Sequence, residues 1–514
     1  MAVKIFASIM IGSTETEMKL YEVSGRKGFH LFDCLSCRID LGNDAYERGT
    51  LSTANVERLI ETLTEYRSIM EGYHVDSYRM VGTSALREIR TALITKDYIE
   101  QKTGLELTIL SNSEQRFLDY KSIAAQAQSF EKVIKKGTAI VNIGGSSLQI
   151  SVFDKDKLIT TQNIRIGRIT TRNRIYPLAK NNEHFEKLLR ELLAHEIAGF
   201  EKLYRKDRQI STLIATNKEL QLLFRSLYPQ RESLIITRQE LSEACGRVVS
   251  MMPDQIARSC SIPAEFSMFV APSAVICLFL LEHFESESVW VPEISIGDGL
   301  AYDYAVENKA VSSPHAFDED IIAAARNIAK RYKSNQAHIR NVEYLSLTIF
   351  DKTRKVHMLG RRQRLLLQIS AILHNCGKYI SLTDVSDCAY NILMATEIIG
   401  LSHAERQIVA NIVRFNTASF KYYDALAAVS SVSREEYLVI AKLTAILRAA
   451  NALDRSHNQR ITDVNVSVKG KELILSTQSN DDLTLERGAL ESGDSLFEEV
   501  FNLKPVLRQK KSAM

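Results

Sequence analysis

A glycine- and serine-rich turn between two apolar runs is the part of this sequence best suited to bind phosphate. The turn consists of Gly144, Gly145, Ser146 and Ser147, and the runs 139–143 and 148–153 on either side predict the two strands of a hairpin. Glycines let backbone N–H groups approach a phosphate, and the hydroxyls add further donors. An enzyme that cleaves phosphoanhydrides normally sets a carboxylate beside such a turn to hold a divalent metal. Asn142 stands there instead, so the pattern predicts phosphate binding with poor provision for cleavage.

The segments around this turn predict a duplicated α/β fold. Residues 3–10 and 17–23 form a second strand–turn–strand pattern near the N-terminus, with Gly12 and Ser13 in its turn. A helix is predicted over 53–72, with Thr53 as its cap, and strands are predicted over 77–82 and 105–110. Two halves that each open with a phosphate-type hairpin indicate two lobes with a cleft between them.

The character of the chain changes towards its C-terminal end. From about 312 to 457 helical periodicity replaces strand-like runs, as in 362–374, 389–400 and 435–453. The last fifty residues are β-rich again. The sequence therefore predicts a helical region followed by a small mixed domain.

Composition excludes several classes of protein. Hydrophobic residues make up 45% and charged residues 25% of the chain, and the net charge is only +3, as expected for a globular protein that does not bind nucleic acid through its overall charge. We expect no membrane-length apolar stretch and no signal peptide, and hence a cytoplasmic location without membrane contact. The seven cysteines are scattered, and the Cys34/Cys37 pair has no second pair, which favours reduced thiols over zinc or redox chemistry.

Four motifs in a fixed order resemble the Ppx/GppA exopolyphosphatase and guanosine-pentaphosphate phosphohydrolase family. They are Ile-Gly-Ser at 11–13, Thr-Ser-Ala-Leu-Arg-Glu at 83–88, Ile-Leu-Ser-Asn-Ser-Glu at 109–114 and Ile-Gly-Gly-Ser-Ser at 143–147. The resemblance implies an α/β fold of the actin-like ATPase superfold. Its expected parts are two RNase H-like lobes at 1–125 and 126–308, a helical HD-domain-like region at 309–458 and a small C-terminal α+β domain at 459–514.

The resemblance also implies roles for the matched residues. Glu114 matches the general base that activates the attacking water, and Arg87 matches an arginine on the phosphate chain. Phosphate contacts are implied for Gly12 and Ser13 in the first turn and for Gly144, Gly145, Ser146 and Ser147 in the second. Each position also has a structural interpretation: Glu114 forms a capping box with Ser111, Arg87 an ion pair, and the glycines ordinary turns.

The departures from the family pattern fall on the metal site. Met10 and Asn142 replace the two aspartates of the phosphate motifs, and Gln149 replaces a glutamate. We expect Mg²⁺ only if the protein is an active hydrolase, and otherwise no cofactor. The helical region has lost its metal set as well, with Asn375 after His374 and Cys388 at an expected histidine position, so no metal is expected there.

Two functions therefore stay open. The first is a protein that binds inorganic polyphosphate or guanosine penta- or tetraphosphate in the cleft, with hydrolysis of the terminal phosphoanhydride weak or lost. The second is an active exopolyphosphatase or guanosine-pentaphosphate phosphohydrolase with Glu114 as base. A sugar-kinase-like ATPase is disfavoured, because the segment 215–219 has no glycine where the nucleotide-side turn is expected. The resemblance further implies a homodimer.

Overall fold

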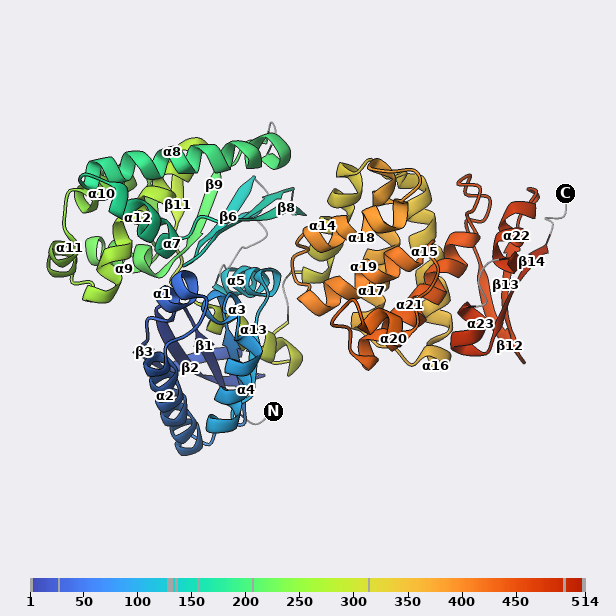
Figure 1. The fold of residues 1–514 in the computed structure, drawn as a ribbon, viewed down its shortest axis with the longest axis horizontal. Helices are drawn as coiled ribbons and strands as arrows, with labels where there is room; N and C mark the ends of the chain where they lie inside the picture. The colour runs from blue at the N-terminus through green and yellow to red at the C-terminus, as the bar shows by residue number, and fades with distance from the viewer. Residues whose placement is uncertain are drawn as a thin grey trace. The chain divides into compact units, whose positions relative to one another are not determined.

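The computed structural model describes residues 3–25, 28–126, 133–134, 137–155, 157–205, 208–312, 315–492 and 496–510. It divides into two compact units, Met1–Ala316 and Phe317–Met514. Each unit is described by itself. Figure 1 shows the first unit in blue through green to yellow-green and the second in yellow through orange to red.

The first unit contains two mixed sheets, of five and six strands, that share the order of their first four strands. The first sheet runs β3-β2-β1-β4-β5, built from β1 (Lys4–Ile11), β2 (Glu15–Ser24), β3 (Gly28–Arg38), β4 (Ser77–Gly82) and β5 (Leu107–Ile109). The second runs β8-β7-β6-β9-β11-β10, built from β6 (Thr138–Ile143), β7 (Leu148–Asp154), β8 (Lys157–Ile164), β9 (Thr212–Thr216), β10 (Ile235–Thr237) and β11 (Ser288–Trp290). In both sheets an antiparallel hairpin leads into a parallel neighbour, β4 beside β1 and β9 beside β6. The predicted duplication of an α/β half is therefore visible in the sheets.

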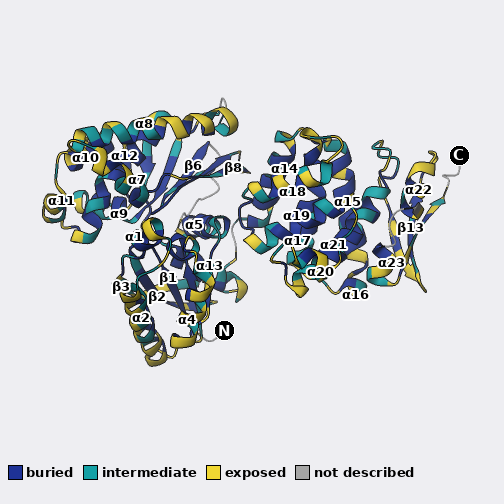
Figure 2. Cartoon of the chain, in the orientation of Figure 1, coloured by how far each residue is buried: buried dark blue, intermediate teal, exposed yellow. Residues whose placement is uncertain are grey.

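Helices cover the two sheets and define two lobes. The first lobe holds α1 (Leu41–Asn43), α2 (Thr53–Gly72), α3 (Ser84–Arg87), α4 (Ala92–Thr103) and α5 (Asn112–Gln126). The second holds α7 (Arg168–Ile175), α8 (Asn182–Phe200), α9 (Lys218–Leu227), α10 (Arg238–Val249), α11 (Pro253–Cys260) and α12 (Ala264–His283). In Figure 2 strands β1 and β6 are mostly buried, whereas residues on α2 and α8 are exposed. The helix predicted over 53–72 is α2, although its cap is Ser52 rather than Thr53.

The chain returns to the first lobe after it has completed the second. Helix α13 (Ile296–Glu307) packs against α5, β1 and β2 (Figure 1). Ile296, Leu300 and Tyr304 share a buried cluster with Phe6 of β1 and Tyr21 of β2. The first lobe is thus built from two separate stretches of the chain, while the limits 1–125 and 126–308 remain predictions.

One helix corrects the expectation that no apolar stretch reaches the length of a membrane span. Helix α12 has 20 residues and a mean hydropathy of 2.0 in its most apolar window, and that window is 72% buried inside the protein. It packs against α7, α8, α9, α10 and α11. Its apolar character therefore matches a core helix, which meets the same criteria of length and composition.

The second unit is helical at first and ends in a small sheet. Its helices are α14 (Phe317–Arg331), α15 (Gln336–Lys352), α16 (Arg354–His357), α17 (Arg361–Leu373), α18 (Val385–Ala395), α19 (His403–Phe415), α20 (Tyr423–Ala427) and α21 (Arg434–Ala452). The closing part contains β12 (Asn465–Lys469), β13 (Glu472–Gln478), α22 (Thr484–Ser492), α23 (Leu496–Phe501) and β14 (Lys504–Lys510), with strand order β12-β13-β14. The predicted change from helices to a β-rich end is observed, although α18 ends before the predicted 400.

Candidate functional site

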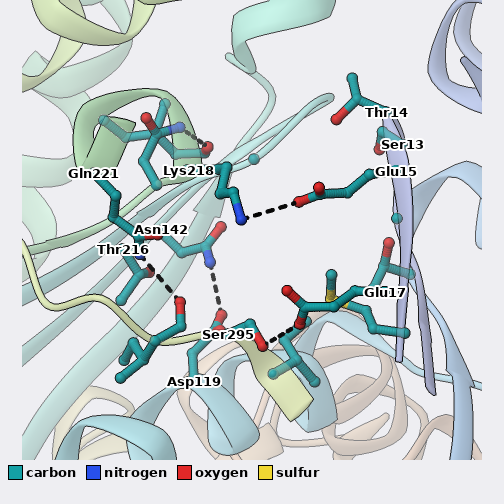
Figure 3. Close-up of a pocket in the computed structure, with 18 of the residues that line it drawn as sticks. Ser13, Thr14, Glu15, Glu17, Asp119, Asn142, Thr216, Lys218, Gln221 and Ser295 are labelled. Carbon is teal, nitrogen blue, oxygen red and sulfur yellow. Dashed lines mark hydrogen bonds and ion pairs between the residues drawn. The ribbon is translucent and has the colours of Figure 1, made fainter. Parts of the chain in front are cut away.

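A cavity of about 430 Å³ lies between the two lobes of the first unit and is lined by both hairpin turns. Strand β1 and its turn contribute Met10, Gly12 and Ser13, and strand β6 and its turn contribute Asn142, Gly144 and Gly145. The structure thus brings these six residues, all singled out from the sequence, onto the wall of one pocket. We call it the interlobe pocket (Figure 3).

The two turns have the same backbone. Gly12 N donates to Glu15 O at 2.9 Å, and Gly144 N donates to Ser147 O at 2.9 Å. A Cβ atom at Gly12 would lie 2.9 Å from Glu15 O, and one at Gly144 would lie 3.0 Å from Ser147 O. Both positions are too tight for a side chain without movement of the backbone, which explains why glycine occupies each.

The turns approach each other over a cluster of hydroxyl groups. Ser13 Oγ lies 2.6 Å from Tyr46 OH, which lies 2.7 Å from Ser84 Oγ. A Cβ atom at Gly145 would lie 2.8 Å from that tyrosine hydroxyl and 2.9 Å from Ser13 Oγ. Gly145 is therefore the point at which the second turn closes onto the first lobe.

The strand-to-helix junction before α5 places Gln115, not Glu114, in the interlobe pocket. Ser111 N donates to Glu114 Oε2 at 2.9 Å and Glu114 N donates to Ser111 Oγ at 3.2 Å. These bonds form the capping box that the sequence offered as the structural interpretation. Glu114 as general base stays a prediction, and this geometry does not support it. Gln115, whose amide cannot accept a proton from water, was missed by the sequence analysis.

Four other predicted site residues lie outside the pocket lining. Arg87 Nη1 donates to Leu110 O at 2.7 Å, and to Gln115 Oε1 at 3.4 Å. The buried Gln149 accepts from Arg116 Nε at 3.3 Å. Ser146 Oγ donates to Glu88 Oε1 at 2.5 Å and ties the lobes together, whereas Ser147 is buried in the turn. Their phosphate and metal roles stay predictions.

Three carboxylates that the motif comparison did not identify line the pocket from the first lobe. They are Glu15 and Glu17 on β2 and Asp119 on α5. Asn142 Nδ2 donates to Asp119 Oδ2 at 2.7 Å across the lobes, and burial raises the pKa of Asp119 to about 7. Ser295 Oγ donates to Glu17 Oε1 at 2.6 Å. The interlobe pocket therefore contains carboxylates, although they lie outside the motif positions at which the sequence analysis expected them.

Most of the cations of the pocket come from the second lobe. Lys218, at the start of α9, lies 3.8 Å from Glu15 across the cleft (Figure 3). Arg168 Nε donates to the buried Glu219 at 2.7 Å, and Arg225 pairs with Glu293. From the first lobe, Lys19 Nζ lies 2.8 Å from Asp298. Each of these four side chains could reach a phosphate only in competition with a carboxylate partner.

The residues present do not fit a divalent metal. The described part of the chain holds no group of three or more His, Cys, Asp or Glu side chains that could bind a metal ion. Met10 offers a thioether and Asn142 an amide, and the amide is already bonded to Asp119. Mg²⁺ prefers several oxygen ligands with charge from carboxylates, and this arrangement does not supply them.

A second polar cluster lies in the helical region. His338 Nδ1 lies 2.8 Å from Asp454 Oδ2, His374 Nδ1 lies 2.7 Å from Ala371 O, and the two Nε2 atoms lie 3.1 Å apart. Burial, with the neighbouring His338 as a second cause, lowers the pKa of His374 to about 3. His357 lies apart and bonds Phe350 O at 2.8 Å. The sequence analysis had not identified His338.

Comparisons with known proteins identify the family to which this chain belongs. The model of the Ppx/GppA phosphatase family matches residues 23–307, and the model of Ppx/GppA phosphatase domain III matches residues 322–498. The chain belongs to the Ppx/GppA phosphatase family. This confirms the resemblance on which the sequence analysis rested.

The Ppx/GppA relatives are distant in sequence but nearly equal in extent. A protein of Aeromonas hydrophila named guanosine-5'-triphosphate,3'-diphosphate pyrophosphatase is 20% identical over 447 residues, which cover 86% of each chain. A protein of Vibrio atlanticus with the same name is 20% identical over 430 residues. Their extent indicates that both units of this chain have counterparts in those proteins.

Solved Ppx/GppA structures share the fold. An exopolyphosphatase from Cytophaga hutchinsonii has a TM-score of 0.54 at 16% identity, covering 60% of this chain and 100% of that chain. The Aquifex aeolicus family member has a TM-score of 0.51 at 16% identity, covering 61% and 100%. These likenesses bear on the fold and leave the chemistry of this chain to its own residues.

Proposed function

We propose that this Ppx/GppA protein binds a phosphate chain in the interlobe pocket and hydrolyses it weakly or not at all. The candidate ligands are inorganic polyphosphate and guanosine penta- or tetraphosphate. We also infer that the two lobes are RNase H-like, that the helical region is HD-like, and that the protein is a cytoplasmic homodimer.

One observation carries the proposal. The side chain that reaches the pocket at the start of α5 is Gln115, while the carboxylate of Glu114 accepts a hydrogen bond from the helix N-terminus. General-base catalysis needs a group that takes the proton of the attacking water. An amide does not do this at neutral pH, so the position that faces the cleft is suited to hold a ligand rather than to activate water.

The charges of the pocket suggest how a phosphate chain would lie. Arg168, Lys218 and Arg225 stand on the second lobe, beside the turn at Gly144 and Gly145. Glu15 and Glu17 stand on the first lobe. A bound phosphate chain would run along the second lobe, where cations and backbone N–H groups attract it. There its distance from Glu15 and Glu17 is greatest.

The active hydrolase remains the alternative, and a specific residue favours it. Asp119 is buried on the pocket wall with a pKa raised to about 7, which is the range that suits a general base. If the protein hydrolyses a phosphoanhydride, we expect Asp119 to be the base. Its hydrogen bond from Asn142 would orient its second oxygen.

Phosphate release separates the two functions. The purified full chain is incubated with long-chain polyphosphate or guanosine pentaphosphate, with Mg²⁺ or Mn²⁺, beside the Asp119→Asn variant. We expect no release above the level of the variant and direct binding of the ligand by titration calorimetry. Release that Asp119→Asn abolishes and Glu114→Gln leaves intact would establish the hydrolase instead.

A repair experiment tests the reason for low activity. The combined substitutions Gln115→Glu, Asn142→Asp and Met10→Asp place carboxylates at three positions on the pocket wall. We expect metal-dependent phosphate release to appear or to rise by at least about 10². The matched control is Gln149→Glu, which adds a carboxylate outside the pocket lining. An equal effect of the control would show that the position of the acid does not matter.

A further inference from the structure

The second unit holds a cavity of about 430 Å³ that is separate from the interlobe pocket. It lies where α22, α23 and the start of β14 pack against the last turns of α21 and the end of α19. A volume of this size lies within the range of pockets that hold small ligands.

The wall of this cavity is cationic. Its described lining includes Arg448 and Arg455 and no aspartate or glutamate. Arg448 Nε donates to Phe415 O at 2.6 Å and Nη2 donates to Ala418 O at 2.5 Å, so the guanidinium is held at the end of α19. Burial lowers the pKa of Arg448 to about 10, while Glu499 acts in the opposite direction. Arg455 follows α21 and is exposed. Two guanidinium groups of this kind suit a phosphate.

An amide on the same wall has no partner. Asn416 is only 6% exposed, and neither its amide nitrogen nor its amide oxygen forms a hydrogen bond with a described residue. Buried amides are normally paired with protein, water or ligand. Asn451 brings a second amide to the lining. Together they offer donors and acceptors, which a ligand with a polar edge would use.

Apart from Thr417, the remaining wall is apolar. Leu490, Leu496, Phe497 and Pro505 line it together with alanines of α21. A ligand that consisted of phosphate alone would leave this surface without a partner. A flat ring would fill it and contact the ring of Phe497.

We propose that this cavity binds a nucleoside phosphate. Arg448 and Arg455 hold the phosphate group, Phe497 and Leu490 contact the base, and the amides of Asn416 and Asn451 bond the polar edge of the base. The site belongs to the second unit and goes beyond the function proposed for the interlobe pocket.

The test is calorimetric titration of the full chain with AMP and GMP, beside ribose 5-phosphate and inorganic phosphate. We expect at least one nucleotide to bind, and Arg455→Ala to weaken its affinity about tenfold. Asn416→Ala is expected to weaken it severalfold, with Asn451→Ala as a second amide variant in case the buried site does not fold. The matched control is Arg434→Ala, which removes an exposed arginine from the first turn of α21 and should leave the affinity unchanged.

Four outcomes would overturn the proposal. The first is no binding of either nucleotide at about millimolar concentration, which means that the cavity holds solvent only. The second is binding of inorganic phosphate or ribose 5-phosphate as tight as that of the nucleotides. The third is displacement of the nucleotide by long-chain polyphosphate. The last is a loss of nucleotide binding in Lys218→Ala with no loss in Arg455→Ala, which would move the nucleotide to the interlobe pocket.

Discussion

The two hairpins that meet at the interlobe pocket have turns with the same backbone hydrogen bond but carry different charges. Both turns close with the same glycine N–H bond of 2.9 Å, and both precede a strand that pairs antiparallel with the first. The first hairpin sends Glu15, Glu17 and Lys19 into the pocket, whereas the second contributes an amide and backbone groups. The comparison shows that the space around each glycine accounts for the shared turn, while the neighbouring side chains give the two turns different chemistry.

The largest effect is expected where the two lobes share Asp119 and Asn142. Burial raises the pKa of Asp119 from 3.8 to about 7, so the folded state binds more protons than the unfolded state between these values. Stability therefore falls as the pH rises from about 4 to about 7 and stays low above it.

Asp119→Asn removes this loss because an amide does not ionise, and the new amide oxygen can still accept from Asn142. We expect its gain in unfolding free energy to be larger at pH 8 than at pH 5 by about 3 kcal/mol. Urea unfolding can be followed by the fluorescence of Trp290, the sole tryptophan of the chain, which lies on β11 in the same unit. An equal gain at both pH values would contradict the conclusion that burial raises the pKa of the Asp119 carboxyl.

A smaller effect is expected from filling the contact between the turns. In Gly145→Ala the new Cβ would lie 2.8 Å from Tyr46 OH and 2.9 Å from Ser13 Oγ. We expect a loss of about 2 kcal/mol in stability and about 30-fold in polyphosphate affinity, because the turn must move away from the first lobe.

Gly199→Ala is the matched control for this variant. It adds the same methyl group on α8, where the new Cβ would have no atom within 4 Å beyond its chain neighbours and the backbone of its own helix. We expect it to be neutral or slightly stabilising, because alanine favours helix. Polyphosphate binding by Gly145→Ala that equals that of the control would show that the turn does not hold the ligand.

The smallest effect concerns the ion pair across the cleft. Lys218→Ala should lower polyphosphate affinity about tenfold, whereas Glu15→Gln should raise it about threefold, because the lysine would no longer be shared with a carboxylate. Both effects should shrink as the salt concentration rises. Calorimetric titration at low and high salt measures both effects. A decrease in affinity for Glu15→Gln would show that Glu15 supports ligand binding instead of competing with the ligand for Lys218.

Local features of the fold were predictable from the sequence, and the partners across the cleft were not. The hairpins followed from glycine and serine between apolar runs, and α2 followed from its apolar spacing. Neighbouring residues on a helix point about 100° apart, so the sequence could not decide which of Glu114 and Gln115 would face the pocket. The pairing of Asn142 with Asp119 joins residues of two different lobes, and no local pattern encodes it.

Some of the missed residues did leave a signal. Gln115 and Asp119 are four residues apart and share one face of α5, so a pocket residue at 115 implies one at 119. Glu15, Glu17 and Lys19 alternate along β2 and therefore point to one side of the sheet. The spacing of these polar residues therefore predicts their shared face, whereas the motif positions show only where carboxylates are replaced.

The return of α13 to the first lobe has a consequence for how the protein is made. The cluster around Phe6 and Tyr21 lacks Leu300 and Tyr304 until the ribosome has synthesised nearly the whole first unit. The N-terminal sheet must therefore wait, with part of its apolar face uncovered, while the second lobe is translated. Segments that wait in this way are open to aggregation and to chaperone binding. A fragment that ends at residue 125 would keep that face exposed, so its solubility during expression should depend on supply of the missing helix as a separate peptide.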